Sequence, residues 1–426
     1  MGERIDQAQA LGRDSILARI AIACICISAP LFAVLTFQPE FTMTAMRTYS
    51  LPLIATEIAV ILLAFFSGFR LAPTLRSIPK PVLAAIIIWL FVALLGAAIS
   101  AYRFFAFFEL GLLMIHLAFA LALFDRLSGS WRRFASAFLL SLALSITLYA
   151  VVVHAFAASV WSDPNFDWLN IGAGAIHVRH LGFYGVALVG LSLGFLVNAR
   201  KGRRVAIAVL CLAVGYYLSA WSGGRNPFLM CIIGSTAFIL YFGGQRKRRL
   251  LAIAAATALI AMPITFLTQP PGSNYGLSTI LKKADPSHPK STQTMSSRLA
   301  MWEASLKATF AERPLIGHGR GSFVREITSY SLHPHNLPVQ LLYNWGLIGT
   351  GALFVLFLLA LRRVPMWAAA DPASALPAIG ALGLLFLISG ADGPFRYGFP
   401  LMVLALCSAV LGSIGVREAK QPSPTA

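Results

Sequence analysis

The sequence is poor in charged residues, and poorest in acidic ones. Only 12% of its 426 residues are charged, with 16 Asp and Glu against 34 Lys and Arg. About a quarter of the residues in a soluble globular chain are charged, whereas here 58% are hydrophobic and the mean hydropathy is +0.75. These values exclude a soluble globular protein.

In a soluble protein a net charge of +18 would suggest that it binds nucleic acid, but here the basic residues fall in short clusters between apolar runs. We therefore expect no nucleic-acid partner.

Residues that usually carry metal, cofactor or ion-transport chemistry are also scarce. The cysteines lie inside apolar runs without metal-ligand spacing, and we interpret all of them as small buried hydrophobic residues: Cys24, Cys26, Cys211, Cys231 and Cys407. The main acidic residues inside apolar runs are Glu57 and Glu109, fewer than a proton- or sodium-coupled transporter usually needs. The outward-facing loops contain no Asp-x-Asp pair, Walker loop, dinucleotide glycine motif or Gly-x-Ser-x-Gly elbow. We predict no metal and no cofactor.

What the chain has in abundance is apolar runs of membrane length. A helix needs about 20 apolar residues to cross a bilayer, and twelve runs meet this requirement. They cover residues 16–37, 51–69, 82–101, 104–124, 134–157, 181–198, 205–222, 226–243, 250–268, 338–361, 374–390 and 397–416. The predicted fold is therefore all-α, a polytopic integral membrane protein of about twelve transmembrane helices in contact with membrane lipids.

The basic residues predict how these helices are oriented, because Lys and Arg are retained on the cytoplasmic side. One set of loops holds most of them, in clusters such as 200–204 and 246–249. The short loops of the opposite face hold only Arg47, Arg103, Arg179, Arg225 and Arg396. We therefore expect both termini in the cytoplasm and one long hydrophilic loop on the outer face. In a bacterium this is the periplasmic side of the inner membrane.

The long loop divides the chain into three parts. Residues 1–268 carry transmembrane helices 1–9, and residues 269–337 form the periplasmic loop, which we expect to carry part of the functional site. Residues 338–426 carry helices 10–12 and a cytoplasmic tail. Apolar runs of membrane length on both sides anchor the loop in water on one face of the membrane.

A short amphipathic helix is predicted inside the loop, over about residues 297–311. Its apolar face consists of residues at helical spacing: Leu299, Trp302, Leu306 and Phe310. Pro314 ends it. Such a helix would lie along the membrane surface or cap the bundle. The glycine-rich segment 317–321 then supplies a tight turn.

The sequence His333-Pro334-His335-Asn336 closes the loop. Asn336 is suited to cap the helix that begins near Pro338, a position where helices tolerate proline. This places His335 at a helix N-terminus, whose amide groups favour anions. A neutral His335 can take a proton from a hydroxyl nucleophile, so we predict it as the catalytic residue, with Asn336 among the substrate-binding residues. A solvated interfacial histidine is the alternative interpretation.

Three arginines on the same face are candidates for binding a negatively charged substrate. Arg225 ends the turn Ser222-Gly223-Gly224-Arg225, where glycines let a ligand approach the backbone and a guanidinium can bind two phosphate oxygens. Arg298 opens the loop helix, and Arg179 precedes the sixth transmembrane helix. Each has a plainer interpretation, an arginine that reaches the headgroups or water. Asp392 and Arg396 are further polar residues of this face.

These motifs and their order resemble the O-antigen ligase family, within the wider group of ligases and polymerases that handle lipid-linked bacterial glycans. The resemblance covers roughly residues 180–350 and includes the large loop late in the chain. It rests on Ser222-Gly223-Gly224-Arg225, on Ser297-Arg298 with Trp302, on Leu315-Ile316-Gly317-His318-Gly319, and on His335-Asn336 followed by Gln340 and Asn344-Trp345-Gly346-Leu347-Ile348-Gly349.

The resemblance implies a membrane glycosyltransferase of lipopolysaccharide biosynthesis. Such an enzyme takes a glycan from an undecaprenyl-pyrophosphate-linked donor and joins it to an acceptor hydroxyl, here most simply that of lipid A-core. Carried over to this sequence, Arg225 and Arg298 bind the donor pyrophosphate and His335 activates the acceptor. Because a polyprenyl pyrophosphate is already a good leaving group, positive charge and one base suffice in principle, without a metal.

Alternative functions remain open at this point. An O-antigen or exopolysaccharide polymerase would use a second lipid-linked glycan as acceptor, and a protein O-oligosaccharyltransferase would use Ser or Thr. From a different class, a polysaccharide or lipid exporter would require a continuous polar path across the bundle. The sequence identifies neither the sugar nor the acceptor.

Overall fold

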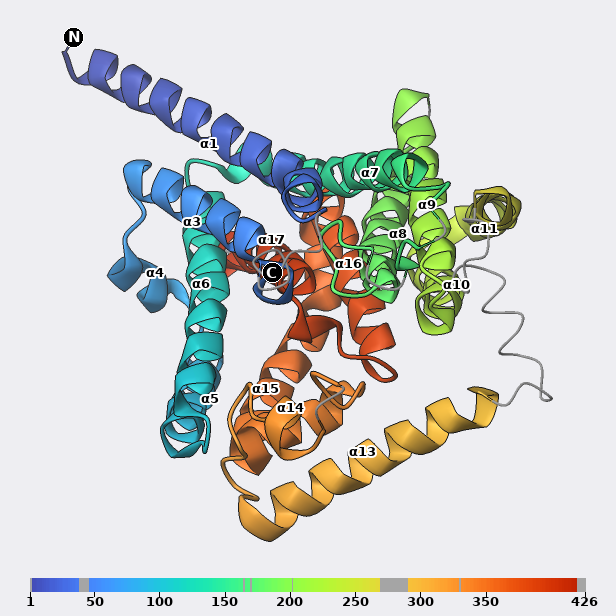
Figure 1. Ribbon diagram of the computed structural model, residues 1–426. Helices are drawn as coiled ribbons and strands as arrows, with labels where there is room; N and C mark the ends of the chain where they lie inside the picture. The colour runs from blue at the N-terminus through green and yellow to red at the C-terminus, as the bar shows by residue number, and fades with distance from the viewer. Residues whose placement is uncertain are drawn as a thin grey trace.

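The computed structural model describes residues 2–37, 46–163, 165–168, 171–200, 202–268, 290–328 and 331–419. Every regular element in these ranges is a helix (Figure 1). The all-α class predicted from hydropathy is therefore confirmed. The first part of the long loop, residues 269–289, lies outside the described residues.

The elements are named in chain order, and η marks a 3-10 helix. They are α1 (Gly2–Leu35), α3 (Leu51–Phe66), α4 (Leu71–Ser77), α5 (Lys80–Ile99), α6 (Arg103–Ser128), η1 (Arg132–Phe134), α7 (Ala135–Ser159), η3 (Val178–His180), α8 (Leu181–Asn198), α9 (Arg203–Trp221), α10 (Arg225–Phe242), η4 (Gly244–Arg246), α11 (Lys247–Leu267), α13 (Lys290–Glu312), α14 (Phe323–Glu326), α15 (Leu337–Ala370), α16 (Pro372–Ser389), η5 (Pro394–Arg396) and α17 (Gly398–Ala419).

Eleven of the described helices are long and apolar enough to cross a membrane, and the number is twelve if the bent pair α3 and α4 forms one span. The prediction of about twelve spans is thus confirmed. The second predicted span, residues 51–69, differs in detail, because α3 has only 16 residues and α4 follows after a bend of 95°. The hydroxyl of Thr74 on α4 donates to Asp125 on α6 (2.8 Å), which ties the bent segment to the bundle.

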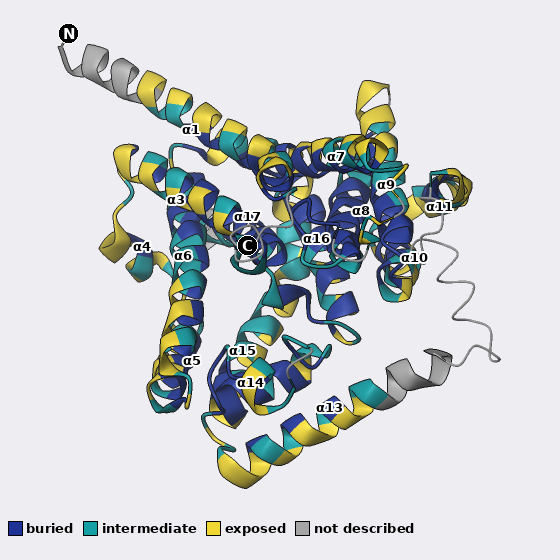
Figure 2. Ribbon diagram, in the orientation of Figure 1, coloured by how far each residue is buried: buried dark blue, intermediate teal, exposed yellow. Residues whose placement is uncertain are grey.

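Helix α8 lies at the centre of the bundle and packs mainly against α16 and α9. Figure 2 shows α8 buried, whereas α1, α5 and α11 expose residues on their outer faces. The crossing of α8 and α16 is close, because a Cβ on Gly190 would lie 2.3 Å from the carbonyl oxygen of Gly380. Small residues at such crossings let backbones pack tightly, a main source of helix association in lipid. Large side chains such as Phe91 face outward instead, 66% exposed, as contact with lipid requires.

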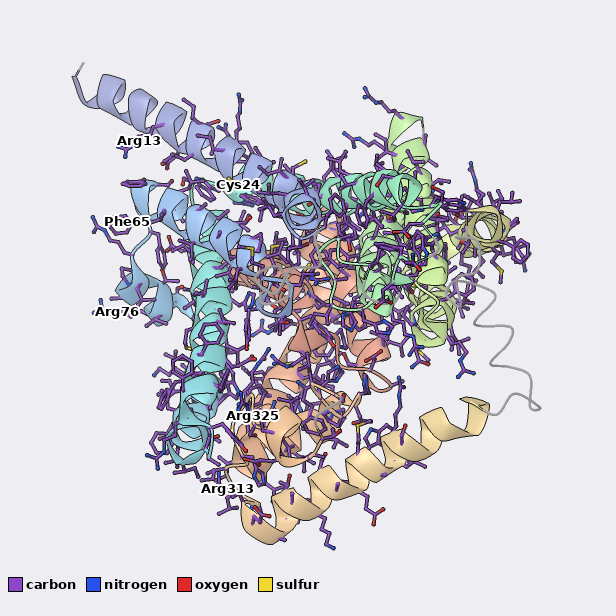
Figure 3. All side chains as sticks on the ribbon, in the orientation of Figure 1. Arg13, Cys24, Phe65, Arg76, Arg313 and Arg325 are labelled. Atoms are coloured by element: carbon purple, nitrogen blue, oxygen red, sulfur yellow. The ribbon has the colours of Figure 1, made fainter. Side chains whose placement is uncertain are left out.

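The two ends of the bundle carry different segments. Residues 290–328 and 331–336 gather at one end, which we call the loop end. The opposite end, the basic end, holds the arginine cluster 246–249, whose Arg246 donates to the carbonyl of Val197 near the last turn of α8 (3.3 Å). Figure 3 shows Arg313 and Arg325 beside the loop elements, and Arg13 on the distant α1.

Helix α15 is broken at Gly346, a break that the predicted span 338–361 did not include. Gly346 has φ 57°, a left-handed conformation that glycine adopts without strain. The segment between α13 and α14 hydrogen-bonds across the break: Leu347 N donates to Pro314 O (2.8 Å), and His318 N donates to Tyr343 O (2.8 Å). Backbone groups freed by the break are therefore paired, as a membrane environment demands.

Helix α13 confirms the predicted loop helix, and the face that it turns toward the rest of the protein differs from the apolar face of the sequence pattern. Leu299 and Phe310 are each 52% exposed, although both belonged to the predicted apolar face. The buried face instead contains Met301, Ser305 and Thr309. The hydroxyls of Ser305 and Thr309 each donate to the backbone carbonyl one turn earlier, that of Met301 (2.6 Å) and that of Ser305 (2.8 Å). A small polar residue satisfied in this way packs closely, so the buried face of α13 need not be its apolar face.

The break at Gly346 leads to a stability prediction. In Gly346→Ala the new Cβ would lie 2.3 Å from the carbonyl carbon of Leu315, and an L-residue in the left-handed region costs about 1–2 kcal/mol even without a clash. We expect a loss of at least about 2 kcal/mol in the free energy of unfolding, measured by denaturation in detergent. Gly351→Ala, in the same helix with nothing within 4 Å of the added Cβ, should be neutral or stabilising. Equal effects of both substitutions would contradict the break.

Candidate functional site

The loop between α16 and α17 is where the residues of the candidate site come together. Its backbone carbonyls accept side-chain hydrogen bonds from three distant helices. Asn336, which caps α15, donates to Gly390 O (3.0 Å). Arg298 of α13 donates through Nη1 to Ala391 O (2.9 Å), and Asn226 of α10 donates to the same oxygen (3.2 Å). The short loop after α16 thus fixes the positions of α10, α13 and α15 relative to one another.

His335 and Asp392 form a hydrogen-bonded pair at this loop. Nδ1 of His335 lies 2.9 Å from Oδ1 of Asp392, and the backbone N–H of Gly393 donates to the same oxygen (2.8 Å). The carboxylate selects the tautomer of neutral His335 that carries its proton on Nδ1. Nε2 then has a free lone pair, and the Ser331 hydroxyl lies 3.3 Å from it. The pair therefore presents a basic nitrogen at a position where a hydroxyl group fits.

The surroundings keep Asp392 ionised. Burial alone would raise the pKa of its carboxyl, but the hydrogen bond from His335 and the nearby positive charge of Arg298 outweigh burial and lower that pKa well below the ordinary aspartate value. An ionised Asp392 orients the imidazole of His335 and stabilises the imidazolium that forms when Nε2 takes a proton.

His333 lies beside this pair, with its ring centroid 4.3 Å from that of His335. Its Nδ1 accepts the backbone N–H of His335 (3.1 Å), and its Nε2 lies 3.2 Å from the Tyr397 hydroxyl. Burial lowers the pKa of His333 well below the usual histidine value, so the ring is neutral at pH 7. An accepting Nδ1 places the proton on Nε2, which donates to Tyr397.

His333, His335 and Asp392 have the composition of a metal site, with one ligand atom of each within 4.8 Å of the others. Hydrogen bonds occupy these atoms, however. Neither nitrogen of neutral His333 keeps a free lone pair, and Nδ1 of His335 points at the carboxylate. We therefore describe the three residues as a hydrogen-bonded cluster, whose chemistry is proton transfer at Nε2 of His335.

The backbone of residues 333–336 is held in an unusual conformation. His335 has φ 55°, a left-handed value that costs a non-glycine residue about 1–3 kcal/mol. Neighbouring contacts fix it: Trp302 of α13 donates through Nε1 to Pro334 O (2.6 Å), and Asn336 Oδ1 accepts the N–H of Val339 (3.1 Å). The predicted N-cap at Asn336 is thus confirmed, and the strain is concentrated at His335.

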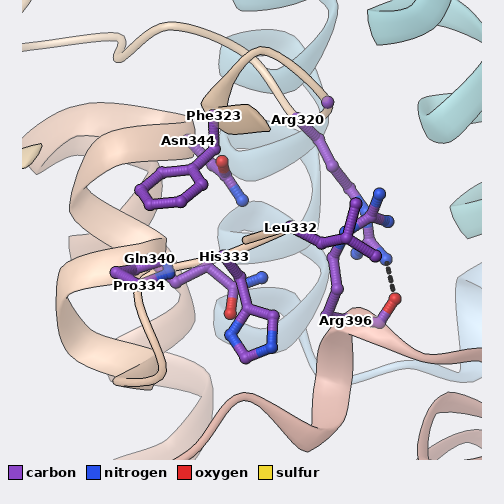
Figure 4. A pocket seen from close by; sticks show the side chains of 9 residues that line it. Arg320, Phe323, Leu332, His333, Pro334, Gln340, Asn344 and Arg396 are labelled. Atoms are coloured by element: carbon purple, nitrogen blue, oxygen red, sulfur yellow. Dashed lines mark hydrogen bonds between the residues drawn. The ribbon is translucent and has the colours of Figure 1, made fainter. Parts of the chain in front are cut away.

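A buried ion cluster lies behind the histidines. Glu109 of α6 accepts two hydrogen bonds from Arg396 of η5, from Nη1 to Oε2 (2.6 Å) and from Nη2 to Oε1 (2.5 Å). Arg320 donates through Nε to Glu109 Oε2 (3.0 Å) and through Nη2 to the carbonyl oxygen of Arg396 (3.1 Å), the bond dashed in Figure 4. Paired charges of this kind tolerate burial because both partners are hydrogen-bonded.

A small pocket opens between this cluster and the histidines (Figure 4). Its lining residues come from the segment before α14 and the start of α14, the residues before α15, the first turns of α15, and η5: Arg320, Gly321, Phe323, Leu332, His333, Pro334, Gln340, Asn344 and Arg396. The pocket is at the loop end of the bundle, next to the His335–Asp392 pair.

The structure brings most of the predicted site residues together. His335, Asn336 and Arg298 all contact the loop 390–393. Arg225 begins α10 and is exposed, and the next residue, Asn226, bonds to this loop. Arg179 lies in η3 next to His180, whose ring centroid is 4.1 Å from that of Tyr397. The roles predicted for these residues stay predictions.

The partners of these residues could not be assigned from the sequence. Asp392, Arg396 and Glu109 were noticed there only as polar residues of the outer face or of an apolar run. Glu109 and Arg396 are separated by 287 residues, so no local pattern links them. The available signal was general: an ionisable residue inside a membrane span requires a partner.

The buried ion cluster leads to a stability prediction. Glu109→Gln would leave Arg320 and Arg396 buried without a carboxylate. Removing one partner of a buried pair costs about 3–5 kcal/mol, which we expect as a lower free energy of unfolding in detergent. Glu303→Gln, on the exposed side of α13, is the matched control and should change stability by less than about 0.5 kcal/mol. A Glu109→Gln protein as stable as the control would show that the cluster is not buried as described.

A family model described as O-Antigen ligase matches residues 210–354, the stretch from α9 to α15 that includes Arg225, Arg298 and His335. No curated protein matches the chain. This match over residues 210–354 supports the resemblance to the O-antigen ligase family that the sequence motifs indicate.

Proposed function

We propose that this protein transfers a glycan from undecaprenyl pyrophosphate to an acceptor hydroxyl, most simply that of lipid A-core. The family match supports a membrane glycosyltransferase-like function in O-antigen processing. The proposal of a pyrophosphate donor and a hydroxyl acceptor is supported mainly by the hydrogen bonds of Arg298, Asn336 and His335 to one loop, residues 390–393. A cationic group and a base are thereby held together, as glycosyl transfer from a pyrophosphate requires.

The positive charges are assigned to the donor. When the bond between the anomeric carbon and the pyrophosphate breaks, negative charge develops on the departing phosphate oxygens. Arg298 and Arg225 can stabilise that charge through bidentate hydrogen bonds. Arg298 is anchored through Nη1 to Ala391, so its guanidinium is oriented before substrate binds. Arg225 stands at the first turn of α10, where backbone N–H groups also favour an anion.

His335 is assigned to the acceptor. Its Nε2 takes the proton of the acceptor hydroxyl while the oxygen attacks the anomeric carbon, and undecaprenyl pyrophosphate leaves with the bonding electron pair. Asp392 stabilises the imidazolium through Nδ1. The proton is then released to water, which restores neutral His335. The Ser331 hydroxyl, 3.3 Å from Nε2, indicates where an acceptor hydroxyl would lie.

The arrangement favours a one-sided site over an exporter. The pocket, the histidines and the ion cluster all belong to the loop end. The excess of basic residues at the other end supports a periplasmic position for the loop end, by the positive-inside rule. A donor presented on the periplasmic side of the inner membrane would reach this site without crossing the bundle.

A transfer assay tests the proposal directly. Membranes with matched expression of wild type, His335→Ala or Arg225→Ala receive a lipid-linked donor together with lipid A-core or a second lipid-linked glycan. We expect product with lipid A-core and a loss of at least about 10²-fold in rate in His335→Ala, because a positioned base contributes that much. Arg248→Ala, exposed at the basic end, is the control and should retain activity.

The outcomes separate the competing functions. Chain extension only with the second lipid-linked glycan would make the protein a polymerase, and glycosylation of a Ser- or Thr-containing acceptor would make it a protein O-oligosaccharyltransferase. Full activity in both variants would overturn the assignment of the site.

The role of Asp392 gives a second prediction. Asp392→Asn keeps the size of the side chain but removes its charge and can select the other tautomer of His335. We expect kcat to fall by about 10²-fold or more, with a much smaller change in acceptor KM, because substrate contacts are retained. Asp163→Asn, in an exposed loop, should behave as wild type. An unchanged kcat in Asp392→Asn would mean that His335 does not act through Nε2.

A further inference from the structure

The pocket behind the His335–Asp392 pair has no assignment in the proposed mechanism. Arg320 and Arg396 form one wall, and Gln340 and Asn344 of α15 form another (Figure 4). These polar side chains are at most 9% exposed. Polar groups removed from water in this way are expected to have partners. The question is which chemical group completes them.

The charges around the pocket do not cancel. Two guanidinium groups, Arg320 and Arg396, face the single carboxylate of Glu109, which leaves one positive charge. Asp392 does not offset it, since that carboxylate is bonded to His335. Burial lowers the pKa of Arg320 to about 10, so the side chain remains protonated at pH 7. A buried positive charge in excess is costly unless an anion approaches it.

The hydrogen-bonding capacity of the pocket is also incomplete. Gln340 is 5% exposed, and its Oε1 has no hydrogen-bond partner in the described part of the chain. The side-chain amide can rotate to present its NH₂ group to an oxygen in the pocket, because the two orientations are nearly equal in shape. Nε and Nη2 of Arg320 are already bonded, to Glu109 and to Arg396, which fixes the guanidinium plane at the pocket wall.

The pocket adjoins the proposed base rather than the arginines assigned to the donor. His333 lines it, and the rings of His333 and His335 are 4.3 Å apart between centroids. The base in the proposed function faces the acceptor, so a pocket that adjoins the base lies on the acceptor side. The donor pyrophosphate is assigned to Arg225 and Arg298, which do not line this pocket.

We infer that this pocket is a second anion subsite, which binds a phosphate group carried by the acceptor near the hydroxyl that is glycosylated. Arg320 and Arg396 supply the charge, and Gln340 and Asn344 supply amide donors. The inference rests on the proposed function, because it takes His335 as the base. It adds a preference for phosphorylated acceptors that is separate from recognition of the donor.

Steady-state kinetics of the full-length protein in detergent test the inference. Two acceptors are compared at saturating donor, lipid A-core with its phosphates and the same material after dephosphorylation. Two variants, Arg320→Gln and Gln340→Met, remove pocket donors, and Gln340→Met leaves the ion cluster intact. Arg325→Gln is the control, an exposed arginine of the same segment stacked 4.1 Å from the Phe105 ring centroid. Thermal unfolding confirms that each variant is folded.

We expect wild type to prefer the phosphorylated acceptor. In Arg320→Gln its KM should rise about tenfold or more, the effect of losing a hydrogen bond to a charged group, whereas KM for the dephosphorylated acceptor and kcat should change little. Gln340→Met should raise the same KM by a smaller factor, and Arg325→Gln should leave it unchanged. Inorganic phosphate should inhibit competitively with the acceptor.

Several results would overturn the inference. Equal KM values for the two acceptors in wild type would exclude a phosphate subsite. A rise in donor KM in Arg320→Gln, or phosphate inhibition competitive with the donor, would assign the pocket to the donor pyrophosphate. If Arg320→Gln fails to fold, an unchanged KM ratio in Gln340→Met contradicts the inference. Absence of transfer by wild type with either acceptor would instead refute the proposed function itself.

Discussion

The carboxylate of Glu109 is the interaction on which the loop end depends. It lies two turns into α6 and is almost fully buried, and it joins the segment before α14 through Arg320 and η5 through Arg396. An ionised group in this position is tolerable only with partners, so α6 specifies where both arginines must lie. Arg396 in turn fixes the short loop that carries Asp392. The orientation of the proposed base therefore follows from a contact with a helix far away in the sequence.

The family match and the structural site overlap only in part. Residues 210–354 contain the base and the two arginines assigned to the donor. Asp392, which orients the base, and the pair Glu109 and Arg396 lie outside that range. The matched segment supplies the groups that would touch substrate, and the helices around it supply the charges that hold those groups. A chain reduced to the matched segment would retain His335 without the carboxylate that selects its tautomer.

Hydropathy predicted the helical spans because membrane length and apolar composition impose them directly. The order of motifs predicted that His335 and Arg298 share one end of the bundle. Contacts between distant residues had no such signal, as the separation of 287 residues between Glu109 and Arg396 shows. The face of α13 that packs on the protein also had no apolar signal, since Ser305 satisfies its hydroxyl within its own helix and packs like a small apolar residue. Patterns predict which residues avoid water, and they do not identify partners.

The four residues His333-Pro334-His335-Asn336 act as one unit. Hydrogen bonds fix the unit from within and from outside: His333 accepts the N–H of His335, Pro334 accepts the indole N–H of Trp302, and Asn336 both caps α15 and donates to Gly390. These bonds offset the cost of the left-handed backbone at His335, about 1–3 kcal/mol. In that conformation the imidazole meets Asp392 while its backbone N–H faces back toward His333. The left-handed backbone at His335 therefore occurs together with both contacts, one that orients the imidazole through Asp392 and one that attaches the backbone to His333 at the pocket wall.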